Sequence, residues 1–146
     1  MHNQEFFDLG VAHIIRQGGP ALIDTFDECN DKNGDTCVYL DKRTNRSCLV
    51  GGVIVPLGLY LPEMETLGVD KWTEADSIMG EALQSVGLTS GQFEFVGRMQ
   101  SCHDEAARSS SAIDFVGAFL DNVRHQAKVY NLDTSVIDRT IAEVAS

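Results

Sequence analysis

Four side chains of this sequence could bind a metal ion or act as nucleophiles: Cys37, Cys48, Cys102 and His103. Thiolate sulfur and imidazole nitrogen are the ligands that Zn²⁺ prefers in proteins. The spacing is unlike a structural zinc site, because ten residues separate the first two cysteines where a zinc knuckle usually has about two to four. Adjacent Cys102 and His103 would also project about 100° apart on a helix. We therefore expect buried, structural thiols and no cofactor, with zinc held by Cys37, Cys48 and His103 as the alternative.

The same side chains could serve a small hydrolase. Cys48 would attack the substrate, His103 would accept its proton, and Asp104 would orient the imidazole ring. Asp104 follows His103 directly, so on a helix we expect its carboxylate to project away from the ring. The alternative function is therefore a metal- or thiol-dependent hydrolase centred on Cys37, Cys48, His103 and Asp104.

The dipeptide His103-Asp104 is also similar to the metal-binding pair of HD-type phosphohydrolases. Such a site needs a helical histidine upstream and a helical aspartate downstream as further ligands. The upstream candidate, His13, lies ninety residues earlier and beyond a predicted hairpin, which does not fit an all-helical metal site. The downstream candidates are Asp133 and Asp138. Because His103 falls in line with Val96 and Met99 on a helix, we expect a partly buried, hydrogen-bonded histidine.

The composition indicates one acidic domain. The 146 residues are enough for a single core, and we assign residues 1–146 to one domain. Twenty-two acidic residues against eleven basic ones give a net charge of −11, which argues against nucleic acid as a partner, since Lys and Arg supply most of that binding energy. No apolar run approaches the roughly 20 residues of a membrane span, so we expect no membrane partner. The N-terminus does not resemble a signal peptide. We therefore expect a cytoplasmic protein with reduced cysteines.

The charges are distributed unevenly along the chain. Acidic residues dominate 63–94, and a tryptophan lies among them. We predict partner contacts at Glu63, Glu65, Asp70, Trp72, Glu74, Asp76 and Glu81. Acidic groups steer a basic partner towards a surface, and an exposed tryptophan anchors it. In the alternative, the acids only keep the protein soluble, Trp72 packs inward, and the basic turn 42–46 with Lys42, Arg43 and Arg46 is the next candidate surface.

The predicted fold is α+β, with a small antiparallel β-hairpin packed on a mainly helical bundle. A first helix begins at Asn3 and ends at Gly18, and strands 36–40 and 47–49 pair across the basic turn. The expected starts of later helices are Thr73, Thr89 or Ser90, Ser111, and Asp133 or Thr134. The expected core combines Ile78, Leu83, Val96, Met99, Phe119, Val123 and Ile137 of the helices with Val38, Leu49 and Val53 of the hairpin region.

Several short motifs occur in a specific order along the chain. They are Cys37-x-Tyr39, Cys48-x-Val50-Gly51 before Pro56, Tyr60 with Pro62-Glu63-Met64-Glu65, and Met99-Gln100-x-x-His103-Asp104. This order resembles a family of small tailed-phage proteins with the pattern C-x-Y…C-x-V-G…P…Y-x-P-x-M-E…L-Q-x-x-H-D. The chain departs from that pattern by one extra residue between Cys48 and Pro56, and by Asn131-Leu132 where Gly-Leu usually closes a helix. The family is known as uncharacterised phage proteins, so the resemblance implies no catalytic residues.

The main functional prediction follows from the acidic surface and the phage resemblance. We expect a small phage accessory protein that binds a host or defence protein, inhibits or modulates it, and works in the cytoplasm of the infected cell. The sequence offers no recognisable set of acid–base residues and no phosphate-binding loop, which favours this prediction over an enzyme.

Overall fold

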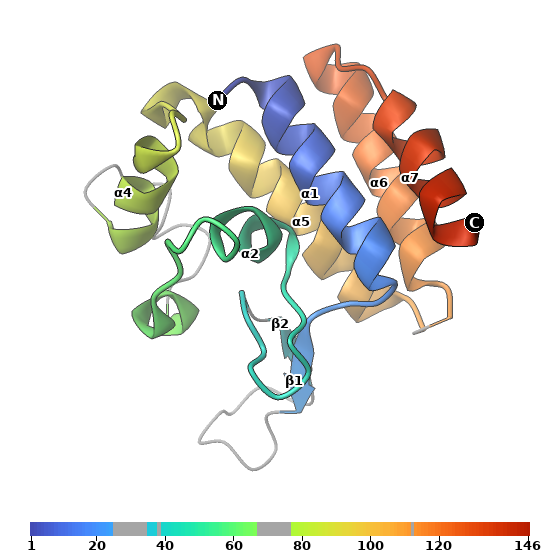
Figure 1. Ribbon diagram of the computed structural model, residues 1–146, viewed down its shortest axis with the longest axis horizontal. Helices are drawn as coiled ribbons and strands as arrows, with labels where there is room; N and C mark the ends of the chain where they lie inside the picture. Colours follow the sequence, from blue (N-terminus) through green and yellow to red (C-terminus); the bar gives the residue numbers. More distant parts are fainter. Residues whose placement is uncertain (25–34, 38, 67–76, 112) are drawn as a thin grey trace.

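The computed structural model describes residues 1–24, 35–37, 39–66, 77–111 and 113–146 (Figure 1). Its α-helices are α1 (Asn3–Gln17), α2 (Leu49–Ile54), α4 (Ile78–Ser85), α5 (Phe93–Ser109), α6 (Phe115–Tyr130) and α7 (Ser135–Ala145). Two 3-10 helices are η1 (Pro62–Thr66) and η2 (Ser90–Gln92), and two strands are β1 (Leu22–Asp24) and β2 (Asp35–Cys37).

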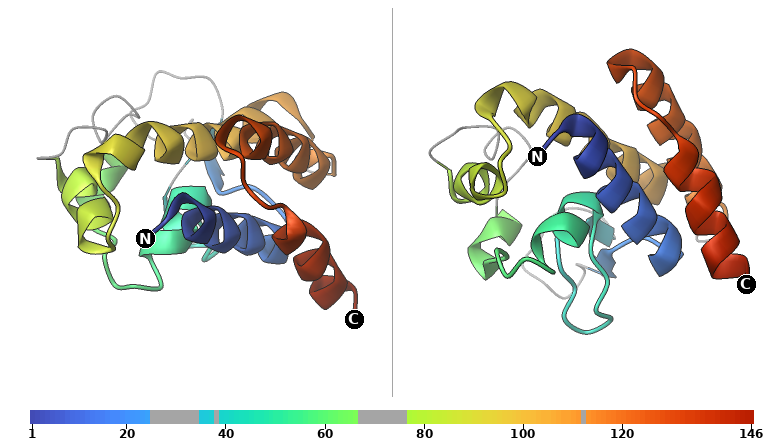
Figure 2. Two further views of the ribbon diagram at one scale, coloured as in Figure 1. Left: turned by 90° about the horizontal axis from the view of Figure 1, so that it is seen from above. Right: turned by 45° about the horizontal axis from the view of Figure 1, so that its top comes forward.

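The helices form two layers around a shared core. Seen from above, α5 and α6 form one layer, while α1 and α2 form the other (Figure 2). Helix α7 packs along α1, and α2 also contacts α5, so the layers are joined through α2. Aromatic side chains fill the space between them, with the rings of Phe6 and Phe95 in an edge-to-face contact at 6.1 Å.

Most of the expected core is confirmed. Leu83, Val96, Met99, Phe119, Val123, Ile137, Leu49 and Val53 are all buried. Ile78 is an exception, because it is the first residue of α4 and its side chain is 37% exposed. Val38 lies outside the described residues.

The predicted α+β class is wrong, and the protein has an all-α fold. The hairpin of strands 36–40 and 47–49 does not form, since residues 49–54 are helical and the three residues of β2 pair instead with β1. Within the described residues these two short strands and an isolated bridge between Asp41 and Arg46 are the only β-structure. They make no sheet layer for the helices to cover.

Tertiary contacts explain why segment 49–54 is helical. Its sequence, Leu-Val-Gly-Gly-Val-Ile, has low helix propensity, because glycine and β-branched residues disfavour a helix. The segment nevertheless packs on α1 and α5. A Cβ atom on Gly51 would collide with the carbonyl oxygen of Tyr39, and one on Gly52 would collide with the ring of His13. Only glycine therefore allows the helix to approach its neighbours this closely.

The helix ends match the sequence prediction closely. Helix α1 is capped by His2, one residue before the expected Asn3, and ends at Gly18 with φ 77°. Ser111 and Asp114 are hydrogen-bonded ahead of α6 as predicted, through a 2.9 Å bond from Ser111 Oγ to Asp114 Oδ2. Asn131 closes α6 with φ 56°, a left-handed conformation that asparagine tolerates better than most residues other than glycine.

The predicted start of the second helix lies outside the described residues. Thr73 and Asp76 belong to this segment, and the described part of α4 begins after Ser77, whose Oγ accepts a 2.9 Å hydrogen bond from the backbone N–H of Gly80. The next helix is preceded by η2, whose Thr89 backbone N–H donates to Gln92 Oε1, as the predicted start at Thr89 or Ser90 implies.

Candidate functional site

His103 lies on α5 and is fully buried. The backbone N–H of Ala21 donates to its Nε2 over 3.1 Å, so Nε2 must be an acceptor. The ring proton then lies on Nδ1, which is 2.9 Å from Oδ1 of Asp104 and donates to it. The imidazole is therefore neutral and held in one tautomer by a partner on each nitrogen.

The expectation that Asp104 would project away from His103 is wrong. The Asp104 side chain turns back along α5, where its Oδ1 accepts from His103 and also from Gln100 Nε2 over 2.9 Å. Gln100 is four residues earlier, so both lie on the same face of the helix. Neighbouring Cα–Cβ bonds on a helix diverge, but the Asp104 side chain bends enough for its carboxylate to reach the ring of the preceding residue.

Gln100 connects this pair to α2. Its Oε1 accepts a 2.9 Å hydrogen bond from the backbone N–H of Val50, in the first turn of α2. Cys48 caps the same turn, since its Sγ accepts from the backbone N–H of Gly51 over 3.4 Å. We refer to Cys48, Gln100, His103 and Asp104 as the α5–α2 network. Its hydrogen bonds reach two separate parts of the backbone, Ala21 and the first turn of α2, and leave no ring nitrogen of His103 available for a substrate.

The Cys48 thiol is poorly suited to nucleophilic attack. Cys48 is fully buried, as we predicted, and this burial raises its pKa well above the usual value. The nearby negative charge of Asp104 raises the pKa further. Because the thiolate is the nucleophilic form, the neutral buried thiol is chemically inert at neutral pH.

We therefore expect alkylating reagents to modify Cys48 only after the protein opens. In the folded protein at neutral pH, iodoacetamide should label Cys48 orders of magnitude more slowly than in denaturant, because access requires local or global unfolding. Mass spectrometry of the labelled peptides measures each cysteine separately, and the denatured sample is the control. Fast labelling of Cys48 in the folded protein would contradict its structural assignment.

The remaining candidate metal ligands do not converge with this network. Cys102 faces α6 rather than His103, and its Sγ donates to the backbone oxygen of Arg98 over 3.3 Å. Burial raises the pKa of Cys102 to about 12. Cys37 ends β2, and its side chain is outside the described part. Among the described residues, no group of three or more His, Cys, Asp or Glu side chains could hold a metal ion.

The residues proposed for an HD-type site have other partners. His13 Nε2 lies 3.1 Å from the carbonyl oxygen of Ser47, and burial lowers the pKa of His13. Asp133 lies just before the N-cap of α7, and its Oδ1 accepts from the backbone N–H of Ser135, the first residue of that helix, over 2.7 Å. Asp138 lies in the first turn of α7 and is exposed.

Glu65, predicted as a partner contact, makes hydrogen bonds within the protein that hold η1 against segment 39–40. Its Oε1 accepts from the backbone N–H of Tyr39, and its Oε2 accepts from that of Leu40, each over 3.0 Å. The Tyr60 hydroxyl donates to the same Oε2 over 2.8 Å, and burial together with this bond raises the pKa of Tyr60. Met64 is fully buried, so the Pro-Glu-Met-Glu motif fixes η1 to the core and to segment 39–40.

The motifs behind the phage resemblance are thus largely structural. Tyr39, Cys48, Val50, Gly51, Tyr60, Met64, Glu65, Gln100, His103 and Asp104 all take part in the contacts described above. The central position of Gln100 was not predicted from the sequence. Gln100 precedes His103 by three residues and Asp104 by four. Residues at these spacings lie on one face of a helix, so the spacing could have indicated that the three side chains meet.

The acidic surface is only partly described. Asp70, Trp72, Glu74 and Asp76 lie outside the described residues. Glu63 of η1 and Glu81 of α4 are exposed, and η1 contacts α4. Three large apolar side chains in or shortly before η1 and α4 are also exposed: Leu57, Leu61 and Ile78. We call these five residues, Leu57, Leu61, Glu63, Ile78 and Glu81, the η1–α4 surface.

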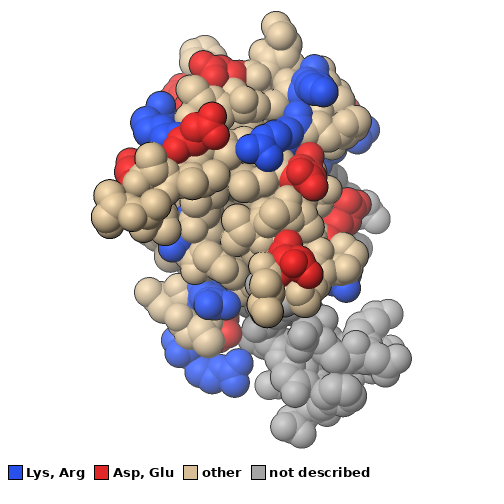
Figure 3. Space-filling view, turned by 90° about the vertical axis from the view of Figure 1, so that its right-hand side faces the viewer, with Lys and Arg blue, Asp and Glu red and all other residues tan. Residues whose placement is uncertain are grey.

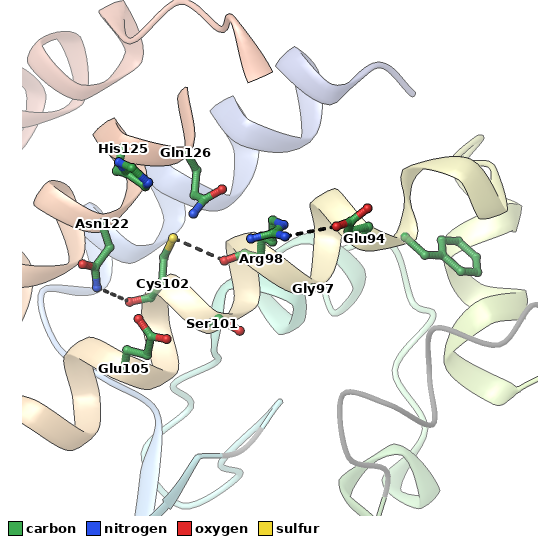
Figure 4. A pocket seen from close by; sticks show the side chains of 10 residues that line it. Glu94, Gly97, Arg98, Ser101, Cys102, Glu105, Asn122, His125 and Gln126 are labelled. Carbon is green, nitrogen blue, oxygen red and sulfur yellow. Dashed lines mark hydrogen bonds and ion pairs between the residues drawn. The ribbon is translucent and has the colours of Figure 1, made fainter. Parts of the chain in front are cut away.

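A groove of about 440 Å³ lies between α5 and α6 (Figure 4). Cys102 and Glu105 of α5 face Asn122 and His125 of α6 across it. Asn122 Nδ2 donates to the backbone oxygen of Cys102 over 3.2 Å. The groove offers hydrogen-bonding groups, but its thiol has a raised pKa and is therefore not an activated nucleophile. No sequence motif had pointed to it.

No helix within the described residues is both long and apolar enough to cross a membrane. No protein-family model matches the chain, and no curated protein or solved structure shows significant similarity to it. What the protein does must therefore be inferred from its own residues and their geometry.

Proposed function

We propose that this protein is a binding protein without catalytic chemistry of its own, and that it docks to a basic surface of another protein through the η1–α4 surface. In this proposal it is a phage accessory product, present in the cytoplasm of the infected cell, and its partner is a host or defence protein. The observation that carries the proposal is the contrast between the buried α5–α2 network and the exposed apolar and acidic groups of η1 and α4.

The first half of that contrast concerns chemistry. The side chains with catalytic potential, Cys48 and His103, are fully buried and hydrogen-bonded to backbone groups. A catalytic group must reach the substrate, or reach it through one water molecule. This arrangement favours a role in holding α2, α5 and the segment at Ala21 together.

The second half concerns recognition. Leu57, Leu61 and Ile78 place apolar area in solvent, and apolar groups beside a polar rim are typical of protein interfaces. Glu63 and Glu81 supply negative charge beside them, which would steer a basic partner and speed association. In the sequence, the predicted contacts Asp70, Trp72, Glu74 and Asp76 connect the two elements.

Substitutions on the η1–α4 surface should reduce the amount of partner protein that the chain captures. We expect the combined variant Leu61→Ser, Ile78→Ser and Glu81→Lys to retain less than about a tenth of the captured partner, because it removes apolar contacts and reverses a steering charge. Pull-down from host lysate followed by quantitative mass spectrometry measures this loss. Circular dichroism checks that the variant remains folded.

A matched control removes similar groups elsewhere. Ile113 is 93% exposed and Asp121 is exposed on α6, so Ile113→Ser combined with Asp121→Lys makes comparable changes away from η1 and α4. This control should capture as much partner as the unchanged protein. If both variants capture the same proteins in the same amounts, the η1–α4 surface is not the binding surface.

A further inference from the structure

We propose that the basic turn 42–46, together with the groove between this turn and α1, binds an acidic segment of a partner protein. The surface is different in residues and opposite in charge to the η1–α4 surface, and the proposal does not depend on that one. Figure 3 shows blue side chains gathered on the lower lobe of a molecule whose net charge is −11. The residues of this basic surface are Arg16, Lys42, Arg43 and Arg46.

The turn has a defined conformation. Asp41 N–H donates to the carbonyl oxygen of Arg46 over 2.8 Å, and Asn45 N–H donates to that of Asp41 over 2.7 Å. The Asp41 carboxylate accepts from the backbone N–H of Arg43 over 3.0 Å and from Thr44 Oγ1 over 2.9 Å. This buried carboxylate also lies 3.9 Å from Nη2 of Arg43, but the Arg43 side chain is 74% exposed, so this long ion pair is weak and leaves the guanidinium group accessible to a ligand. The basic side chains are therefore presented from a backbone that is already ordered.

Hydrogen bonds attach the turn to α1. The backbone N–H of Ser47 donates to Gln17 Oε1 over 2.8 Å, and Gln17 Nε2 donates back to the carbonyl oxygen of Ser47 over 2.9 Å. The same carbonyl oxygen accepts from His13 Nε2. The turn is thus fixed beside the C-terminal half of α1. Arg46 of the turn and Arg16 of α1 line the same groove.

Arg46 is positioned over the end of α1. Its Nη1 donates to the carbonyl oxygen of Pro20 over 3.4 Å, and a Cβ atom on Gly19 would lie 2.6 Å from the same nitrogen. Glycine at position 19 therefore leaves room for the guanidinium group. The remaining N–H groups of a guanidinium fork can pair with a carboxylate in a bidentate manner.

The groove between the turn and α1 has a volume of about 570 Å³. Arg16, Arg46 and Asn45 contribute polar groups to it, and Leu9 and Pro56 contribute exposed apolar surface. Arg16 also pairs with Glu143 at 2.9 Å, an exposed ion pair that a ligand carboxylate can replace at little cost. An extended segment with carboxylates and an apolar side chain fits this combination of groups.

The charge balance favours an acidic peptide over nucleic acid. Binding to a phosphate backbone needs many basic contacts, and the remaining surface of this acidic chain repels a polyanion of that length. A short acidic segment meets only the basic surface and avoids most of that repulsion.

The test uses an oligoglutamate peptide that carries one leucine. In an NMR titration of the full chain at low salt, this peptide should shift the amide resonances of residues 13–17 and 41–47. The charge-reversal pair Lys42→Glu and Arg43→Glu should weaken binding at least about tenfold, while Arg108→Glu with Lys128→Glu, exposed on α5 and α6, should change it less than about threefold. The neutral pair Lys42→Gln and Arg43→Gln should weaken binding by an amount between these two losses. This neutral pair also provides the test if the charge-reversed protein does not fold.

Three outcomes would overturn the proposal. Equal weakening by both charge-reversal pairs would mean that net charge alone governs binding. Tighter binding of a single-stranded oligonucleotide of equal charge at the same resonances would assign the surface to nucleic acid. Shifts that appear only on raising the protein concentration, without peptide, would assign it to contact between two copies of this chain.

Discussion

Replacing Gly51 by alanine is expected to destabilise the folded protein by about 3 kcal/mol, at the upper end of the usual range for overpacking. The added Cβ would collide with the carbonyl oxygen of Tyr39. That atom belongs to the backbone, which cannot move aside as the end of a flexible side chain can. It lies next to the segment that Glu65 holds, so a shift of Tyr39 would also disturb the hydrogen bond from its N–H to Glu65 Oε1.

Gly117→Ala is the matched control for this substitution. Gly117 lies in α6, is exposed, and would have no atom within 4 Å of an added Cβ. Alanine is a better helix former than glycine, so we expect Gly117→Ala to raise stability by about 0.5–1 kcal/mol. Urea denaturation followed by circular dichroism gives both free energies of unfolding. Equal effects of the two substitutions would mean that α2 does not need its close approach to Tyr39.

Replacing His103 by alanine is expected to cost about 3–5 kcal/mol of folding stability. The substitution leaves the Ala21 N–H without its acceptor and Asp104 without one donor, and it leaves a cavity where the ring stood. The ring also contacts Phe115 edge to face at 5.5 Å, and that contact is lost as well. His103→Gln keeps an acceptor for the Ala21 N–H and should therefore lose less than His103→Ala.

A double-mutant cycle separates the network from simple cavity formation. Because His103 and Asp104 share a hydrogen bond, the losses from His103→Ala and Asp104→Ala should not add. His125→Ala on the exposed face of α6 is the control and should change stability by less than about 0.5 kcal/mol. Additive losses within the error of urea denaturation would show that the hydrogen bond between the two side chains contributes nothing.

The long helices could be predicted because their determinants are local. Apolar residues recur at helical spacing in α5, α6 and α7. Ser111 and Asp133, just before α6 and α7, make hydrogen bonds to groups only two or three residues away. Gly18 ends α1 for an equally local reason, since glycine adopts a positive φ readily.

Segment 49–54 could not be predicted because its determinants are far away in the sequence. Glycine disfavours a helix and β-branched residues favour an extended chain, so the local sequence does not predict a helix here, and the predicted strand 47–49 overlaps the segment at Leu49. Its helical form depends on Gln100, fifty residues later, which accepts from the Val50 N–H, and on the close contact of Gly51 with Tyr39. Tertiary packing therefore decided the fold class here, against local propensity.

The candidate site also has features that could be predicted from residue types and features that depend on distant contacts. Residue types alone indicated that Cys48 and His103 would be buried, because free cysteine and a histidine in line with apolar residues usually are. Only the tertiary structure brought Ala21 and Val50 to the side chains of α5 and turned Asp104 towards His103. Residue types thus indicate the burial of a thiol and an imidazole, but every buried polar group also needs a hydrogen-bond partner, and these partners come from distant segments that meet only in the folded chain.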